Sequence, residues 1–226
     1  MNLVKSYDFF RPEDVKERIH IIGCGAVGST IAELLARFGV KNITLYDFDR
    51  VEAHNIANQM FTSEDIGKPK VDAVKEMIVR INPDAEQFIR TVPNGYVGQR
   101  LAGYIFLAVD NIDLRREIVE KNVRNPYIKA VFDIRIRLED GQHYAADWRV
   151  KSMVDNLLAS MQFTHEEAKA NAPVNACNME LSVAPTVRDI CTKAVVNFVN
   201  FAKGKKLMGV VTSNPWGWMS DAFEIA

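Results

Sequence analysis

The sequence of 226 residues has few cysteines and histidines and contains no long apolar run. The three cysteines lie far apart and form no CxxC pair (Cys24, Cys177 and Cys191), which disfavours a disulfide framework and a structural zinc site. The four histidines are equally scattered. No segment approaches the ~18 consecutive apolar residues that a membrane-spanning helix needs. These absences argue against redox chemistry and zinc chemistry.

The sequence also lacks an excess of either charge. It has 28 basic and 29 acidic residues, which excludes a general attraction to nucleic acid or acidic membranes. Its N-terminal segment, MNLVKSYDFFRPEDVKER, is charged throughout and has no apolar signal-peptide core. We therefore expect a cytoplasmic protein.

No repeat or long linker interrupts the chain, so residues 1–226 are expected to form one domain. Apolar strand patterns alternate with helical patterns through the first 136 residues. This order predicts a Rossmann-like α/β fold, with a mainly parallel sheet and helices on both faces. The expected strands are 18–22, 42–49, 104–110 and 127–136, and the expected helices are 27–39, 68–83 and 113–124.

The C-terminal portion is expected to be antiparallel. RLEDGQHYAADWRV, residues 137–150, reads as a hairpin with DG as its turn. Residues 151–176 read as helix or loop, and a further helix is expected from Ser182 to residue 204. Periodicity does not decide whether Trp216 and Trp218 are exposed or pack on the core.

Gly23, Gly25 and Gly28 form a GxGxxG pattern between the first strand and the first helix. Such a turn lets phosphate approach the backbone at a helix N-terminus. Asp47 follows Gly28 by 19 positions, where a carboxylate can bind ribose hydroxyls. The alternative is that the glycines only ease packing, and the pattern alone does not separate NAD from ATP.

Four acidic residues are expected at the carboxyl edge of the sheet, where ligands of such folds gather. They are Asp47, Asp49, Asp110 and Asp133. Asn55, Asn58, Gln59 and Lys70 follow the second strand. A dehydrogenase requires no such amides or lysine, whereas a triphosphate site uses both to orient and neutralise phosphate oxygens. The alternative for Lys70 is a solvated cation at a helix start.

These segments resemble the ThiF/MoeB/HesA superfamily, which includes the adenylation domains of ubiquitin-activating enzymes. The resemblance is carried by the glycine turn and by LYDFDRVEAHNIANQ, DIGKPKV, RINPDAE and LAVDNIDLRR. It implies an ATP-dependent adenylyltransferase that uses Mg2+ and releases pyrophosphate. The substrate would be the C-terminal carboxylate of a ubiquitin-like or sulfur-carrier protein ending in glycine, or of a peptide, and the enzyme would be a homodimer.

The resemblance also implies residue roles. Asp47 would hold the ribose, Lys70 the phosphates and Asp110 the magnesium ion, while Asn55 and Gln59 would line the phosphate site and Asp49 would support it. Asp110 could instead be a solvated strand end or a helix cap. Cys177 is the candidate thiol, with burial at a helix entrance as the alternative; Cys24 and Cys191 are expected to pack in the interior.

The sequence departs from the family pattern at Asn58, where relatives have arginine. An asparagine lacks the permanent charge and the bidentate geometry of arginine, so this departure is expected to slow turnover and to leave nucleotide binding intact. Arg50 or Arg115 of the same chain could replace the missing arginine at the phosphates, and so could Arg11 of a partner subunit. Asp133 and Arg135 alternate on one strand, where Arg135 could bind substrate or form an ion pair.

Without a paired CxxC motif or room for further catalytic domains, the chain reads as a minimal, stand-alone adenylation domain. A catalytically inactive nucleotide-binding or partner-binding relative is the first alternative, favoured by Asn58. An NAD-dependent oxidoreductase is the second, although no second catalytic half for hydride transfer is evident.

Overall fold

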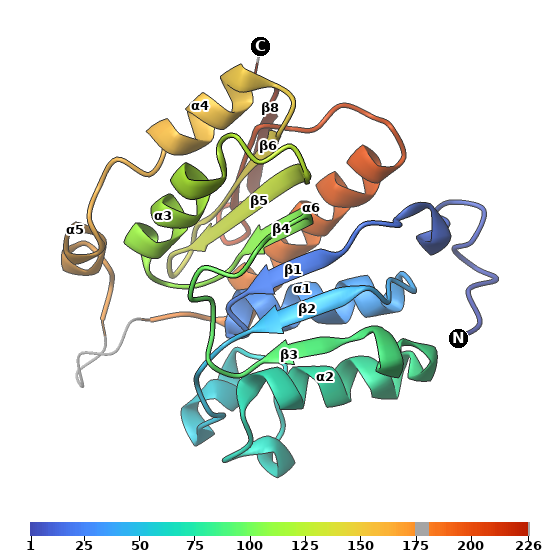
Figure 1. The fold of residues 1–226 in the computed structure, drawn as a ribbon. Helices are drawn as coiled ribbons and strands as arrows, with labels where there is room; N and C mark the ends of the chain where they lie inside the picture. The colour runs from blue at the N-terminus through green and yellow to red at the C-terminus, as the bar shows by residue number, and fades with distance from the viewer. Residues whose placement is uncertain (175–180, 226) are drawn as a thin grey trace.

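The computed structural model describes residues 1–174 and 181–225, which are built around one eight-stranded mixed sheet (Figure 1). The strands lie in the order β3-β2-β1-β4-β5-β6-β7-β8. The Rossmann-like prediction, including an antiparallel C-terminal portion, is confirmed. The strands are β1 (Ile19–Ile22), β2 (Ile43–Tyr46), β3 (Arg90–Val92), β4 (Gly103–Leu107), β5 (Ile128–Ile136), β6 (Gly141–Asp147), β7 (Val210–Asn214) and β8 (Met219–Phe223).

The first five strands form the parallel half of the sheet. Every residue of β1, β2 and β4 is buried, as expected for parallel strands that are covered on both faces. The edge strand β3 was not predicted, because three residues carry too little pattern to be distinguished from a loop.

Helices cover both faces of the sheet (Figure 1). The crossovers from β1 to β2 and from β2 to β3 run in one direction along the sheet, and the crossover from β4 to β5 runs in the other. Because such crossovers are right-handed, α1 and α2 lie on one face and α3 on the opposite face. The helices are α1 (Ala26–Arg37), α2 (Lys70–Ile81), α3 (Ile112–Asn122), α4 (Lys151–Ala159), α5 (His165–Ala170) and α6 (Ala184–Ala202).

The chain order creates a crevice between β1 and β4. After β1 the chain moves outward through β2 and β3, and it then returns to place β4 on the other side of β1. The chain segments that follow β1 and β4 therefore lead to helices on opposite faces of the sheet, and open α/β sheets bind ligands at the carboxyl ends of such strands. The fold alone places the candidate site here.

The antiparallel wing consists of β6, β7 and β8, which extend the sheet beyond β5. The predicted hairpin is present: Arg137 N donates to Asp140 O at 2.7 Å, and Gly141 opens β6. Its first strand is β5 rather than residues 137–140. The hairpin of β7 and β8 was not predicted.

The two tail tryptophans behave differently. Trp216 is 54% exposed, and its Nε1 donates to Thr186 Oγ1 at 3.0 Å. Trp218 is 95% exposed. Among the described residues, no helix combines the length and the apolar character that a membrane crossing requires.

Candidate functional site

A cleft of about 1670 Å³ opens at the carboxyl edge of the parallel strands and continues over the antiparallel wing. Its walls come from the glycine turn, the loops after β2 and β4, the α4–α5 segment and strands of the wing. The residues considered in the sequence analysis that line it are Gly23, Gly25, Asp47, Asp49, Asn55, Asn58, Gln59, Lys70, Asp110, Arg115 and Arg135. Loops far apart in the sequence therefore converge on one space.

The three glycines of the turn meet three different requirements. Gly23 has a φ of +97°, and a Cβ there would lie 2.7 Å from the carbonyl carbon of Ala108. A Cβ on Gly28 would lie 1.8 Å from Gly23 O, so this glycine lets α1 pack against the turn. A Cβ on Gly25 would meet nothing within 4 Å, because this position faces open space. Gly25 is thus the one of the three that leaves room for a ligand beside the backbone.

Asp47 lies directly after β2 and is held by backbone amides. Its Oδ2 accepts a hydrogen bond from Cys24 N at 2.6 Å, and its Oδ1 accepts one from Asp49 N at 2.8 Å. Burial raises the pKa of Asp47, while these two hydrogen bonds oppose that rise. The carboxylate is therefore fixed against the glycine turn by neutral donors.

Lys70 opens α2 and forms an ion pair with Asp49. Its Nζ lies 2.8 Å from Asp49 Oδ2, and only 10% of its side chain is exposed. The backbone explains this pairing, since Lys70 N donates to Asp49 O at 2.9 Å beside an antiparallel bridge between Arg50 and Pro69. Asp49 thus positions the ammonium group at the cleft.

The amide residues differ in what they contact. Asn55 is buried, and its Oδ1 accepts from Glu52 N at 2.9 Å, which caps a short 3-10 turn (Ala53–Ala57). Asn58 Nδ2 donates to Ser182 O at 3.5 Å. Gln59 Oε1 is buried and has no hydrogen-bond partner within residues 1–174 and 181–225. A buried polar atom without a partner is costly, so Gln59 fits a site that a ligand donor completes.

Asp110 is exposed at the cleft, three residues beyond β4. Asn111, not Asp110, caps α3, because Asn111 Oδ1 accepts from Leu114 N at 3.1 Å. The described residues contain no group of three or more His, Cys, Asp or Glu side chains that could hold a metal ion. Mg2+ commonly uses one or two carboxylates together with substrate phosphates and water, so a single exposed Asp110 fits such an ion.

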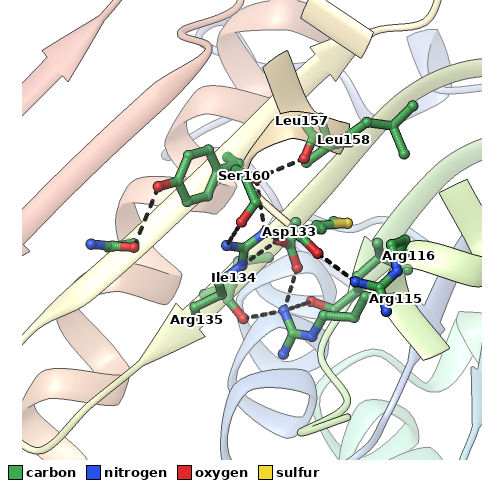
Figure 2. A network of polar contacts seen from close by, with 12 residues as sticks. Arg115, Arg116, Asp133, Ile134, Arg135, Leu157, Leu158 and Ser160 are labelled. Carbon is green, nitrogen blue, oxygen red and sulfur yellow. Dashed lines mark hydrogen bonds and ion pairs between the residues drawn. The ribbon is translucent and has the colours of Figure 1, made fainter. Parts of the chain in front are cut away.

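Asp133 does not project at the carboxyl edge, contrary to the prediction. It is completely buried in β5, where it forms ion pairs with Arg115 of α3 and with Arg135 of the same strand (Figure 2). Arg135 also donates to Ser160 O at 2.7 Å and Ser160 Oγ at 2.9 Å, and its guanidinium stacks 4.6 Å above Tyr144. The structure shows the ion pair, and Arg135 also lines the cleft, so a contact with substrate stays a prediction.

The arginines considered as replacements for the missing one make other contacts. Arg50 donates to Gly67 O at 2.6 Å and does not line the cleft. Arg115 lines the cleft, but it is mostly buried and forms an ion pair with Asp133. The guanidinium of Arg11 lies 5.5 Å from the ring of Tyr7. None of these contacts involves Asn58, and a contribution of Arg11 from a partner subunit stays a prediction.

The thiols give no further candidate among the described residues. Cys24 and Cys191 are buried, as predicted, and burial raises the pKa of both thiols. Cys177 lies outside the described residues. Sequence reasoning missed a second wall of the cleft, because these residues belong to no motif and only the fold brings them there: Ser160, Gln162, Phe163, His165, Lys169, Thr212, Asn214 and Asp221.

The chain is similar in sequence to known proteins. A sequence model of the ThiF family matches residues 14–213. Over 134 residues the chain is 31% identical to ubiquitin-like modifier-activating enzyme 5 of Drosophila persimilis, a match that covers 52% of this chain and 34% of that protein. The chain thus spans about a third of the length of such curated relatives.

Two solved structures share the fold. PaaA superposes with a TM-score of 0.72 at 20% identity, over 98% of this chain and 68% of that one. E. coli MccB, in a crystal structure with ATP, superposes with a TM-score of 0.76 at 14% identity, over 95% of this chain and 66% of that one.

Proposed function

Because the chain belongs to the ThiF family, we propose that it is an ATP-dependent adenylyltransferase. Its substrate is the C-terminal carboxylate of a ubiquitin-like or sulfur-carrier protein, or of a peptide. The observation that carries this proposal is that Lys70 and Asp110 border the same cleft as the open glycine turn. A cationic amine and an exposed carboxylate beside such a turn suit a nucleoside triphosphate and its divalent cation.

The residues divide the work of nucleotide binding. Asp47, fixed by two backbone amides, accepts hydrogen bonds from the ribose hydroxyls. Gly25 leaves space for phosphate oxygens beside the N-terminus of α1. Lys70 supplies positive charge to the phosphates, and Asn55 and Gln59 line the same site. Asp110 holds Mg2+, which when bound neutralises phosphate charge.

The reaction needs positioning more than covalent help from the protein. A substrate carboxylate oxygen bonds to the α-phosphorus of ATP as the bond to the pyrophosphate oxygen breaks, which leaves an acyl-AMP. Lys70 stabilises the negative charge that builds on the phosphate oxygens as the bond breaks. Asp49 keeps the ammonium group oriented through its ion pair at 2.8 Å.

One feature favours a second candidate function, a relative that binds nucleotide or partner without turnover. Asn58 offers a neutral amide where the family pattern usually has an arginine, and that amide donates to Ser182 O. The two functions differ in one measurement. An adenylyltransferase exchanges labelled pyrophosphate into ATP when its substrate is present, whereas a binding protein only retains ATP.

ATP–pyrophosphate exchange with glycine-tailed candidate partners tests the proposal. We expect exchange by the wild type and a loss on the order of 100-fold in Lys70→Ala and in Asp110→Ala. Lys68→Ala is the matched control. Lys68 lies two residues away and pairs with Asp65 and Glu76 outside the cleft, so exchange should persist. Exchange that survives in both site variants would overturn these assignments.

Asn58→Arg separates the two candidate functions further. If the missing guanidinium limits turnover, this substitution raises the exchange rate above that of the wild type while the affinity for ATP changes little. A wild type that binds ATP without exchange, and an Asn58→Arg variant that remains inactive, would support the binding protein instead. Binding of NADH followed by its fluorescence tests the remaining oxidoreductase alternative.

A further inference from the structure

Arg115 binds the loop that carries Asp110. Its Nε donates to Val109 O at 2.7 Å, and its Nη2 donates to the same oxygen. Its Nη1 donates to Leu107 O at 3.3 Å and Ile134 O at 2.8 Å. One buried side chain thus joins the ends of β4 and β5 to the residue that precedes Asp110.

The residue after Asp110 is fixed as well. Asn111 caps α3 through Leu114 N, and its carbonyl accepts from Arg115 N at 3.2 Å. The backbone is therefore held on both sides of Asp110, while the Asp110 side chain itself is exposed at the cleft. This arrangement orients a carboxylate without using up its oxygens.

The same loop also packs against the glycine turn. A Cβ on Gly23 would lie 2.7 Å from the carbonyl carbon of Ala108 and 2.8 Å from Val109 N. The turn and the Asp110 loop are thus in direct backbone contact. A displacement of Val109 would change the position of Asp110 relative to Gly23.

Removal of Arg115 would not leave a buried carboxylate alone. Asp133 is also paired with Arg135, whose Nη2 lies 2.6 Å from Asp133 Oδ2 (Figure 2). An uncompensated buried charge is what makes the loss of one partner strongly destabilising. With Arg135 still in place, the Arg115 contacts can be tested in a folded protein.

We propose that Arg115 is a positioning residue that holds the Asp110 carboxylate ready for the divalent cation of the nucleotide complex. Arg115 acts through the Val109 carbonyl and does not touch the ion. The proposal rests on the metal role of Asp110 in the proposed function. Substitution of a residue that orients a metal ligand without binding the metal itself typically lowers the metal affinity about 10-fold to 100-fold. An effect of this size is measurable.

Binding of Mn2+, followed by electron paramagnetic resonance with a non-hydrolysable ATP analogue present, tests this role without turnover. We expect Arg115→Met to weaken Mn2+ binding about 10-fold or more, and Arg115→Lys to restore part of it. Affinity for the analogue in the presence of EDTA should stay unchanged in both variants. Circular dichroism and thermal melting verify that each variant is folded.

Arg116→Met is the matched control for the Mn2+ titration. Arg116 neighbours Arg115 on α3, but it donates to Met161 O at 2.8 Å and Phe163 O at 3.1 Å and pairs with Asp113 of the same helix, rather than with residues 107–111. Its Mn2+ affinity should equal that of the wild type.

The outcomes distinguish two failures. If folded Arg115→Met binds Mn2+ like the wild type while Asp110→Ala does not bind it, the positioning role is wrong and the proposed function stands. If Asp110→Ala also binds Mn2+ like the wild type, Asp110 is not the metal ligand and both assignments fall.

Discussion

Asp47 and Asp133 are both carboxylates of the sheet, but their surroundings differ between the parallel half and the side of the antiparallel wing. Asp47 follows β2 in the parallel half and is held by two backbone N–H groups. Asp133 lies on β5, against the antiparallel wing, and is held by two guanidinium groups. The neutral N–H donors leave the negative charge of Asp47 available at the cleft, whereas two guanidinium groups neutralise the charge of Asp133.

The difference extends to how each region is assembled. Around Asp47, the contacts come from the backbone of adjacent loops, so the site is built from a short span of sequence. Around Asp133, they come from side chains of α3 and β5, and the same network reaches Ser160 at the end of α4. We therefore expect the loss of the Asp47 carboxylate to change mainly ligand binding and the loss of the Asp133 carboxylate to change mainly stability.

The largest effect is expected for Asp133→Ala. Its loss leaves the Arg115 guanidinium buried without a counterion, which should lower the free energy of unfolding by about 3–5 kcal/mol. Asp47→Ala should lower it by only about 1–2 kcal/mol, because it removes hydrogen bonds from neutral donors, while it weakens ATP binding. Urea unfolding and ATP titration of both variants measure this contrast. Equal destabilisation of the two variants would contradict the proposed difference between the two carboxylates.

A smaller contrast is expected within the glycine turn. Gly28→Ala forces a methyl group against Gly23 O and should cost about 1–3 kcal/mol of stability. A methyl group on Gly25 meets open space, so Gly25→Ala should cost less stability than Gly28→Ala while ATP affinity falls. Thermal melting and calorimetric ATP titration distinguish the two. A Gly25→Ala variant that binds ATP normally would contradict a phosphate position beside this residue.

The wing should also make stability depend on pH through His143. Burial lowers the pKa of this histidine from 6.5 to about 4, and its Nε2 accepts from Asn197 Nδ2 at 3.0 Å. The unfolded chain binds a proton in this range and the folded chain does not. Stability should therefore fall as the pH falls from about 6.5 to about 4, by up to about 1.4 kcal/mol per pH unit.

His143→Gln removes this contribution and keeps an acceptor for Asn197. Urea unfolding between about pH 4.5 and 7 measures the change in slope. Part of the slope should remain, because burial also lowers the pKa of His20 to about 4. An unchanged slope in His143→Gln would show that His143 does not titrate as described.

The smallest effect is expected at the tip of the wing. Trp218→Ser should change stability by less than about 0.5 kcal/mol, since the side chain is 95% exposed. Trp216→Ser should cost about 1 kcal/mol, because it removes the hydrogen bond to Thr186. Melting temperatures of the two variants test this order. A larger loss of stability in Trp218→Ser would mean that the Trp218 side chain packs against the protein.

Much of the parallel half could be predicted from sequence because its signals are local. The glycine turn, the acid after β2 and Lys70 at the start of α2 lie within 48 residues of one another, from Gly23 to Lys70. Each is bounded by an apolar strand or a periodic helix, and neighbouring loops then bring them together. Asp110 followed from the same logic, since parallel strands end at one edge.

The rest was decided by tertiary structure. The strand and helix patterns predicted the layers of the fold, because hydrophobic periodicity indicates which faces of each element are buried. Periodicity does not record which distant side chain a buried charge will meet. Asp133 was expected at the edge and lies inside, since Arg115 from another element can reach and neutralise it only after the chain has folded. The same holds for β8 and the second wall of the cleft, whose neighbours are chosen by packing rather than by local sequence.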